Sequence, residues 1–135
     1  MVNEAVIIEL LGNRGDPVRY TVDNTIGVEK GTLMYMSDPR TALASDTTAA
    51  RPFAGIAAAE KVANDGATTL ALYTNGIFDI LSSGAVLFGT GDLVQLSNAA
   101  NVVQECGGVI SGGIVVGQAL EDNSASEVVA VKVKV

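Results

Sequence analysis

The sequence repeats itself at a spacing of about sixty residues, and this repeat constrains the fold more than any other feature. Gly31–Ser37 (Gly-Thr-Leu-Met-Tyr-Met-Ser) is echoed by Gly91–Ser97 (Gly-Asp-Leu-Val-Gln-Leu-Ser), 60 positions later (91 − 31). Two further segments are echoed in the same order: Phe53–Glu60 by Val115–Glu121, and Thr69–Tyr73 by Val128–Val133. A fixed period with small slips in the loops indicates a duplicated supersecondary unit.

The repeated segments are short and rich in β-branched residues, which predicts strands. Val18–Asp23 alternates apolar and polar residues, the period of a half-buried strand. The apolar run within Met1–Gly12 is also more typical of a strand than of a helix, because Val6, Ile7 and Ile8 are β-branched. Phe53–Val62 is compatible with an Ala-rich helix, but its echo around Gly117 favours a strand. About ten short strands separated by frequent turns indicate an all-β barrel or sandwich.

Four connecting segments carry local predictions. Asn75-Gly76 lies between two β-rich runs and predicts a two-residue hairpin that pairs Tyr73 with Phe78 and Ala71 with Ile80. Asp38–Pro52 contains two prolines and no apolar period, which predicts a long exposed loop. The remaining two predictions are one helical turn over Ser83–Gly89 and a flexible connector over Gly107–Gly113.

Composition excludes several classes of function. The net charge is −7 and the eight basic residues are spread along the chain, so neither nucleic acid nor an anionic membrane surface is expected as a partner. Histidine is absent and Cys106 is the only cysteine, which excludes His-based triads and His or Cys zinc sites. No apolar run approaches the roughly 20 residues of a membrane span. The first residues lack the pattern of a signal peptide, so we expect a soluble protein of a cytosol-like compartment.

No motif assembles a catalytic or cofactor site. Gly84–Gly91 lacks the Gly-Lys-Ser/Thr ending of a phosphate loop and is interpreted as a turn. Arg14-Gly15-Asp16, the tripeptide that integrins bind, precedes Pro17 and is interpreted as ordinary turn chemistry. Glu105 is expected to raise the pKa of the neighbouring Cys106 thiol and leave it inert. We therefore expect no enzyme, no metal and no cofactor.

The order of elements resembles a known family. From about Ile26 to Val135 the chain contains Gly-x-Leu-x-x-x-Ser, a loop, a Gly-x-Ala strand and an Asn-Gly-Ile-Phe segment. Gly-Asp-Leu-Val, a second Gly-x-Ala segment and a final alternating strand follow. This order resembles the small capsid-decoration, or cement, proteins of tailed phages, in particular a family long catalogued only as a domain of unknown function.

The resemblance implies a small β-barrel or β-tulip-like body that forms a homotrimer on the outer surface of a phage capsid and stabilises the shell. It implies the major capsid protein as partner, production in the host cytoplasm, and an extended N-terminal arm that pairs with capsid strands. The expected organisation is an arm and first strand over 1–20 and one barrel domain over 21–135, with repeats at about 26–80 and 85–135. The expected capsid-binding residues are Asn3, Glu4, Ala5, Val6, Ile7, Ile8, Glu9, Leu10 and Leu11. The expected intersubunit contacts are Asp38, Pro39, Arg40, Arg51 and Pro52.

A different class of function also fits the residues. A small β-barrel binding module for sugar or peptide, on a bacterial surface or in a secreted protein, is compatible with the same composition and the same strands. A leader peptide in the gene would favour that alternative, and a neighbouring capsid gene would favour decoration.

Overall fold

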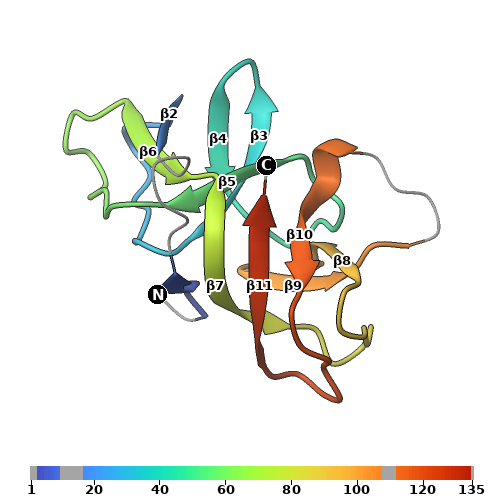
Figure 1. The fold of residues 1–135 in the computed structure, drawn as a ribbon. Helices are drawn as coiled ribbons and strands as arrows, with labels where there is room; N and C mark the ends of the chain where they lie inside the picture. The colour runs from blue at the N-terminus through green and yellow to red at the C-terminus, as the bar shows by residue number, and fades with distance from the viewer. Residues whose placement is uncertain (1–2, 10–16, 108–111, 135) are drawn as a thin grey trace.

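The regular secondary structure of the described residues consists of short strands and one short 3-10 helix. The computed structural model describes residues 3–9, 17–107 and 112–134, which form the strands given below, labelled in Figure 1 except for β1, and one 3-10 helix, η2 (Gly112–Ile114). The first six strands are β1 (Val6–Glu9), β2 (Val18–Thr21), β3 (Leu33–Asp38), β4 (Thr41–Ala44), β5 (Phe53–Ala57) and β6 (Thr69–Tyr73). The other five are β7 (Asn75–Ser82), β8 (Leu93–Leu96), β9 (Val102–Glu105), β10 (Val115–Ala119) and β11 (Val128–Lys134).

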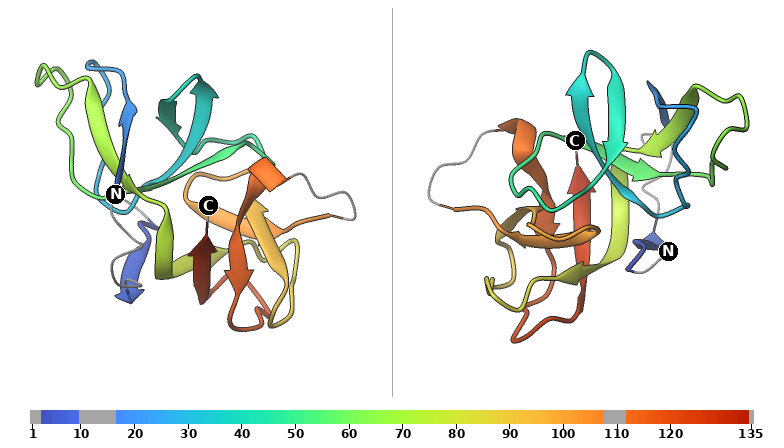
Figure 2. Two further views of the ribbon diagram at one scale, coloured as in Figure 1. Left: turned by 45° about the horizontal axis from the view of Figure 1, so that its top comes forward. Right: turned by 180° about the vertical axis from the view of Figure 1, so that it is seen from behind.

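These strands close into two small barrels. The first barrel has the strand order β2-β4-β3-β5-β6 and is closed by the pairing of β6 with β2. The second has the order β7-β11-β10-β8-β9 and is closed by the parallel pairing of β9 with β7. Strand β1 is added to β7 outside this ring. The further views in Figure 2 separate the two barrels and show the β3–β4 hairpin projecting from the first.

The two barrels share one pairing pattern. Each strand from β2 to β6 corresponds to the strand five places later, because β2–β6, β3–β4, β3–β5 and β5–β6 are antiparallel pairs, as are β7–β11, β8–β9, β8–β10 and β10–β11. The single parallel contact in each barrel also corresponds, β2 with β4 and β7 with β9. The later set begins with β7 at Asn75.

Equivalent hydrogen bonds support this correspondence. The N–H of Gly31 donates to the carbonyl of Ala57 at 2.9 Å, and the N–H of Gly91 donates to the carbonyl of Ala119 at 2.8 Å. Both glycines have positive φ, 88° and 93°, a conformation that side chains disfavour. The repeated Gly-x-Leu motif therefore forms the same backbone turn in both barrels.

The predicted fold class is confirmed. The chain is all-β, its body is barrel-shaped and built from a duplicated unit, and the N-terminal segment is extended. The similarity of Phe53–Val62 to the segment around Gly117 correctly predicted a strand, because Phe53–Ala57 forms β5. The division into domains at residue 20 stays a prediction.

The predicted Asn75-Gly76 hairpin is wrong. Strand β6 pairs with β2 and β5, whereas β7 pairs with β1, β9 and β11, so the two runs belong to different barrels. Only Thr74 separates them, and Asn75 and Gly76 belong to β7, where they lie opposite Lys134 and Val133. Seven consecutive β7–β11 pairs outweigh a local turn preference, because strand pairing depends strongly on its neighbours.

Two loop predictions also need correction. Asp38–Pro52 is not one long loop, because Thr41–Ala44 forms strand β4 and Ala42 is buried in the first barrel. Ser83–Gly89 forms bends instead of a helical turn. Of the predicted connector Gly107–Gly113, residues 108–111 lie outside the described residues, and Gly112 and Gly113 belong to η2.

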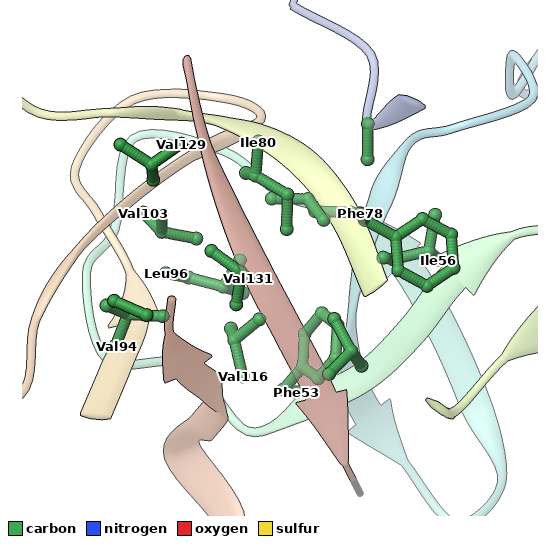
Figure 3. Packing of buried hydrophobic residues seen from close by; sticks show 14 of the residues in the cluster. Phe53, Ile56, Phe78, Ile80, Val94, Leu96, Val103, Val116, Val129 and Val131 are labelled. Carbon is green, nitrogen blue, oxygen red and sulfur yellow. The ribbon is translucent and has the colours of Figure 1, made fainter. Parts of the chain in front are cut away.

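The larger hydrophobic cluster joins the two barrels. Figure 3 shows Phe53 and Ile56 of β5 packed with side chains of the second barrel, among them Phe78, Ile80 and Val131. A smaller cluster fills the first barrel with Val22, Val28, Met34, Ala42, Ala54, Ala57, Leu70 and Leu72. Both faces of β5 are therefore buried, one inside its own barrel and one against the other barrel. Burying a side chain such as Phe78 contributes about 1.5–3 kcal/mol.

Candidate interaction surfaces

The N-terminal strap, defined as residues 3–9, spans the junction between the barrels. The N–H of Ala5 donates to the carbonyl of Gly31 in the first barrel at 2.7 Å. Val6 and Ile7 pair with Asp79 and Phe78 of the second barrel. The predicted arm therefore lies against the body over its described residues, and Leu10 and Leu11 lie outside them.

The strap presents apolar side chains to solvent. Ala5 is buried and Ile7 packs against the larger cluster, whereas Val6 and Ile8 are each 54% exposed. This alternation is that of an edge strand with one face on the core. Strand β1 ends the strand order of its sheet, so its second edge has no strand against it among the described residues. An edge of this kind is suited to receive another strand.

A cleft of about 390 Å³ lies beside the strap. Its walls come from the strap on one side and the first barrel on the other, and the lining residues are Glu4, Ala5, Val6, Ile7, Lys30, Gly31, Ile56, Ala57 and Tyr73. Tyr73 also contacts Phe78, with ring centroids 5.9 Å apart. The cleft is mostly apolar and contains no arrangement of nucleophile and base.

The predicted intersubunit residues divide into three environments. Asp38, Pro39 and Pro52 line one shallow cleft of about 280 Å³ at the β3–β4 turn, together with Met36 and Ser37. Arg40, at φ 52°, points elsewhere and donates from Nε to the carbonyl of Arg19 at 3.0 Å. Only part of the predicted contact set is therefore gathered at one place.

Arg51 is held by neighbouring side chains of its own chain. Its Nη2 pairs with a carboxylate oxygen of Asp46 at 2.9 Å, and its guanidinium lies 4.3 Å from the ring centroid of Tyr35. A cation over an aromatic ring at this distance is attracted by the ring quadrupole. Arg51 is about one-third exposed, so these contacts orient a side chain that remains accessible.

Cys106 and Asp122 are two described titratable groups whose surroundings shift their pKa values. Burial raises the pKa of the Cys106 thiol, and the neighbouring Glu105 raises it further, in the predicted direction. Hydrogen bonds from the Thr90 hydroxyl and N–H hold the pKa of Asp122 below its ordinary value, which is the behaviour of a capped loop carboxylate. Within the described ranges, acidic and sulfur side chains nowhere gather in threes that could hold a metal ion. Those ranges also contain no helical segment with the length and apolar character of a membrane span.

The buried polar residues include Lys61 and Asn101, whose burial the sequence pattern did not indicate. The ammonium of Lys61 donates to the carbonyls of Asn24 at 2.8 Å and Ile26 at 3.2 Å, although its side chain is only 2% exposed. Asn101 accepts from the N–H of Leu33 at 2.9 Å and so links the second barrel to the first. Lys61 is equivalent to Asn123 at a displacement of 62 (123 − 61), and both residues are buried in the structure.

Comparison with known proteins supports the family resemblance. The profile of a family described as phage cement protein matches residues 12–135, which includes both barrels and leaves out the strap. No curated protein matches the chain. Because the match covers well over half of the chain, the chain belongs to the phage cement protein family.

Proposed function

We propose that the protein decorates the outer surface of a phage capsid and stabilises the shell, without catalysing a reaction. The observation that carries this proposal is the family match over residues 12–135. The net charge of −7 suits a surface that faces away from the genome. The described residues present an accessible strap and shallow clefts, which suit binding between protein surfaces.

The strap is the proposed contact with the major capsid protein. Val6 and Ile8, each 54% exposed, offer an apolar surface, and the second edge of the strap offers backbone hydrogen-bonding groups. A capsid strand added to this edge would gain main-chain hydrogen bonds for affinity and side-chain contacts for specificity. The arrangement differs from a free arm, because residues 5–7 stay docked on their own body while the outer edge binds.

The proposed assembly is a homotrimer. Asp38, Pro39 and Pro52 share one shallow cleft, and the adjacent residues in the sequence are exposed (Arg40) and half-buried (Arg51). Contact of this surface with a neighbouring subunit would bury additional area in a chain with few aromatic residues. Light scattering of the purified protein, and of an Arg51→Glu variant, tests this part of the proposal separately from capsid binding.

Co-sedimentation with expanded capsids that lack the protein tests the central proposal. Purified protein should pellet with these capsids at a saturable ratio and raise the temperature at which they rupture. A Val6→Asp, Ile8→Asp variant should bind at least about tenfold more weakly, because two charges would enter an apolar contact. An Ile26→Asp variant is the matched control, since Ile26 is 47% exposed in a different region. Equal binding by the double variant and the wild type would contradict the strap as the capsid contact, and no saturable binding would contradict the function.

A further inference from the structure

The duplication allows each edge of one barrel to be compared with its counterpart in the other. The N–H of Val22 donates to the carbonyl of Thr68, and the N–H of Ser82 donates to the carbonyl of Glu127, both at 2.9 Å. These equivalent bonds align the residues of β2 with those of β7 at a difference of 60 in residue number (82 − 22). Arg19 therefore corresponds to Asp79, and Val18 corresponds to Phe78.

In the second barrel, the strap pairs with the edge of β7 that faces away from β11. Successive residues of a strand direct their backbone groups to opposite edges. Because Ser82 directs its N–H toward the β11 side, Asp79 directs its backbone groups to the other edge, where Val6 is its partner. Ile7, the next residue of the strap, packs against the larger cluster beside Phe78.

In the first barrel, no described strand covers the corresponding edge at residues 18–20. Strand β4 meets β2 only at the pair Thr21 and Thr41. Val22 directs its N–H toward Thr68 on the β6 side, so Arg19 directs its N–H and carbonyl to the open side. The group that meets the Arg19 carbonyl is a side chain, the guanidinium of Arg40, at 3.0 Å.

The open edge carries apolar and cationic character together. Val18 is 37% exposed, whereas its counterpart Phe78 is fully buried. Arg19 and Arg40 are both exposed, in a chain with only eight basic residues and a net charge of −7. A strand that docked here would meet exposed aliphatic surface and two cations, so apolar residues and a carboxylate complement it.

We propose that the outer edge of β2 at residues 18–20 is a strand-docking site for an extended segment of a partner polypeptide. The occupant has apolar residues at alternating positions and at least one carboxylate. The strap on β7 supplies the register: the partner residue in the place of Val6 lies opposite Arg19, and the residue in the place of Ile7 lies opposite Val18. The incoming N–H replaces the Arg40 side chain at the Arg19 carbonyl and leaves the guanidinium to pair with the carboxylate.

A peptide with the sequence of residues 3–9 (Asn-Glu-Ala-Val-Ile-Ile-Glu) is the probe, because the equivalent edge already binds this sequence. Titrated into isotope-labelled protein, it should shift the amide signals of residues 18–21 and 40–41 in a saturable manner. Methylation of the peptide's Val6 nitrogen, which removes the N–H that faces the edge, should weaken binding at least about tenfold. Methylation of its Ile7 nitrogen, which faces away, should change binding by less than about twofold.

A pair of protein variants tests the same edge from the other side. Arg19→Pro removes the outward N–H without removing a bond to β6, so it should abolish binding, whereas Arg19→Ala retains that N–H and should bind. The two methylated peptides keep the test decisive if the proline variant does not fold. Absence of saturable shifts up to millimolar peptide, shifts confined to Phe78 and Asp79 of β7, or equal binding by both methylated peptides would each overturn the proposal. None of these outcomes bears on capsid binding, which co-sedimentation measures independently.

Discussion

The first barrel closes one end with a buried lysine, whereas the second closes the equivalent end with a buried asparagine. Lys61 exchanges two backbone hydrogen bonds with Val28, at 2.7 and 2.8 Å. Asn123 donates its N–H to the carbonyl of Phe88 at 3.2 Å and accepts the Phe88 N–H with its side-chain oxygen at 2.7 Å. The duplication therefore preserved a bridge between the same two loops while its chemistry diverged.

The barrels differ equally in their first strands. Strand β7 is eight residues long, alternates between buried and half-buried side chains and carries the strap. Strand β2 is four residues long, and none of its side chains is fully buried. The second barrel therefore contributes most of the larger hydrophobic cluster, which it shares with the first barrel. The first barrel has its own smaller cluster, and the edge of its strand β2 is not covered by a described strand. The comparison shows that the same strand-pairing pattern can form one barrel whose first strand is covered (β7, by the strap) and one whose first strand has an accessible backbone edge (β2).

Equivalent apolar positions should differ most in stability. Phe78→Ala removes a fully buried side chain from the shared core and should lower the free energy of unfolding by about 3–5 kcal/mol. Val18→Ala, at the corresponding position, should cost less than about 1 kcal/mol because Val18 is partly exposed. Urea unfolding of both variants measures the difference. Similar losses at the two positions would contradict the assignment of the shared core to β7.

Both end closures should depend on the hydrogen bonds of their buried side chain. Lys61→Met keeps an aliphatic stem but leaves the carbonyls of Asn24 and Ile26 without their donor, so we expect a loss of about 2–3 kcal/mol. Asn123→Asp keeps an acceptor for the Phe88 N–H and loses the donors to Ser82 and Ser83, at a similar cost. Thermal unfolding compares them with wild type. A change below about 0.5 kcal/mol in Lys61→Met would show that the buried ammonium is not required for closure.

The two turn glycines provide a matched pair for the strap. A Cβ at Gly31 would lie 2.7 Å from the Ala5 carbonyl oxygen, whereas at Gly91 the nearest atom outside the turn is the Gln118 amide nitrogen at 3.9 Å. Both substitutions by alanine carry the cost of positive φ, about 1–2 kcal/mol. Only Gly31→Ala should also displace the strap, seen as faster hydrogen exchange at Asp79. Equal exchange at Asp79 in the two variants would contradict strap docking at Gly31.

The smallest expected effect concerns Asp122 in the loop before β11. Thr90→Val removes the hydroxyl that donates to Asp122 and should raise the pKa of that carboxyl toward its ordinary value. Since the folded-state pKa lies below the unfolded value, the wild-type carboxylate stabilises the fold above the unfolded pKa. This stabilisation is lost as pH falls through the folded pKa, and the variant should lose less over that window. NMR titration of the Asp122 carboxyl carbon gives the shift, and an unchanged pKa would contradict the hydrogen bond.

The sequence predicted the duplicated architecture because its signal was non-local. Gly31 and Gly91 require the same positive φ, and the apolar pattern that follows each one places equivalent strands. The Asn75-Gly76 hairpin prediction failed because it rested on a local dipeptide, whereas the pairing of β7 is decided by β1, β9 and β11. The β4 strand was missed because prolines at both ends of Asp38–Pro52 obscured a four-residue segment.

The candidate interaction surfaces were only partly predictable. The apolar character of Val6 and Ile8 is visible in the sequence, whereas their exposure follows from the position of β1 at a sheet edge, which only the structure shows. The open edge at Arg19 could not be predicted, because among the described residues a strand covers this edge in the second barrel and none covers it in the first. The burial of Lys61 could not be predicted either, because it depends on the backbone carbonyls that surround its ammonium in the folded chain.

Amide hydrogen exchange of the unmodified protein at Asp79 and Arg19 tests the central comparison most directly. These residues occupy equivalent positions, one facing the strap and the other facing an edge that no described strand covers. Because a hydrogen-bonded amide exchanges only after local opening, Asp79 should exchange at least about a hundredfold more slowly than Arg19. Equal protection at the two positions would contradict the account, since it would mean that both edges are covered or that neither is.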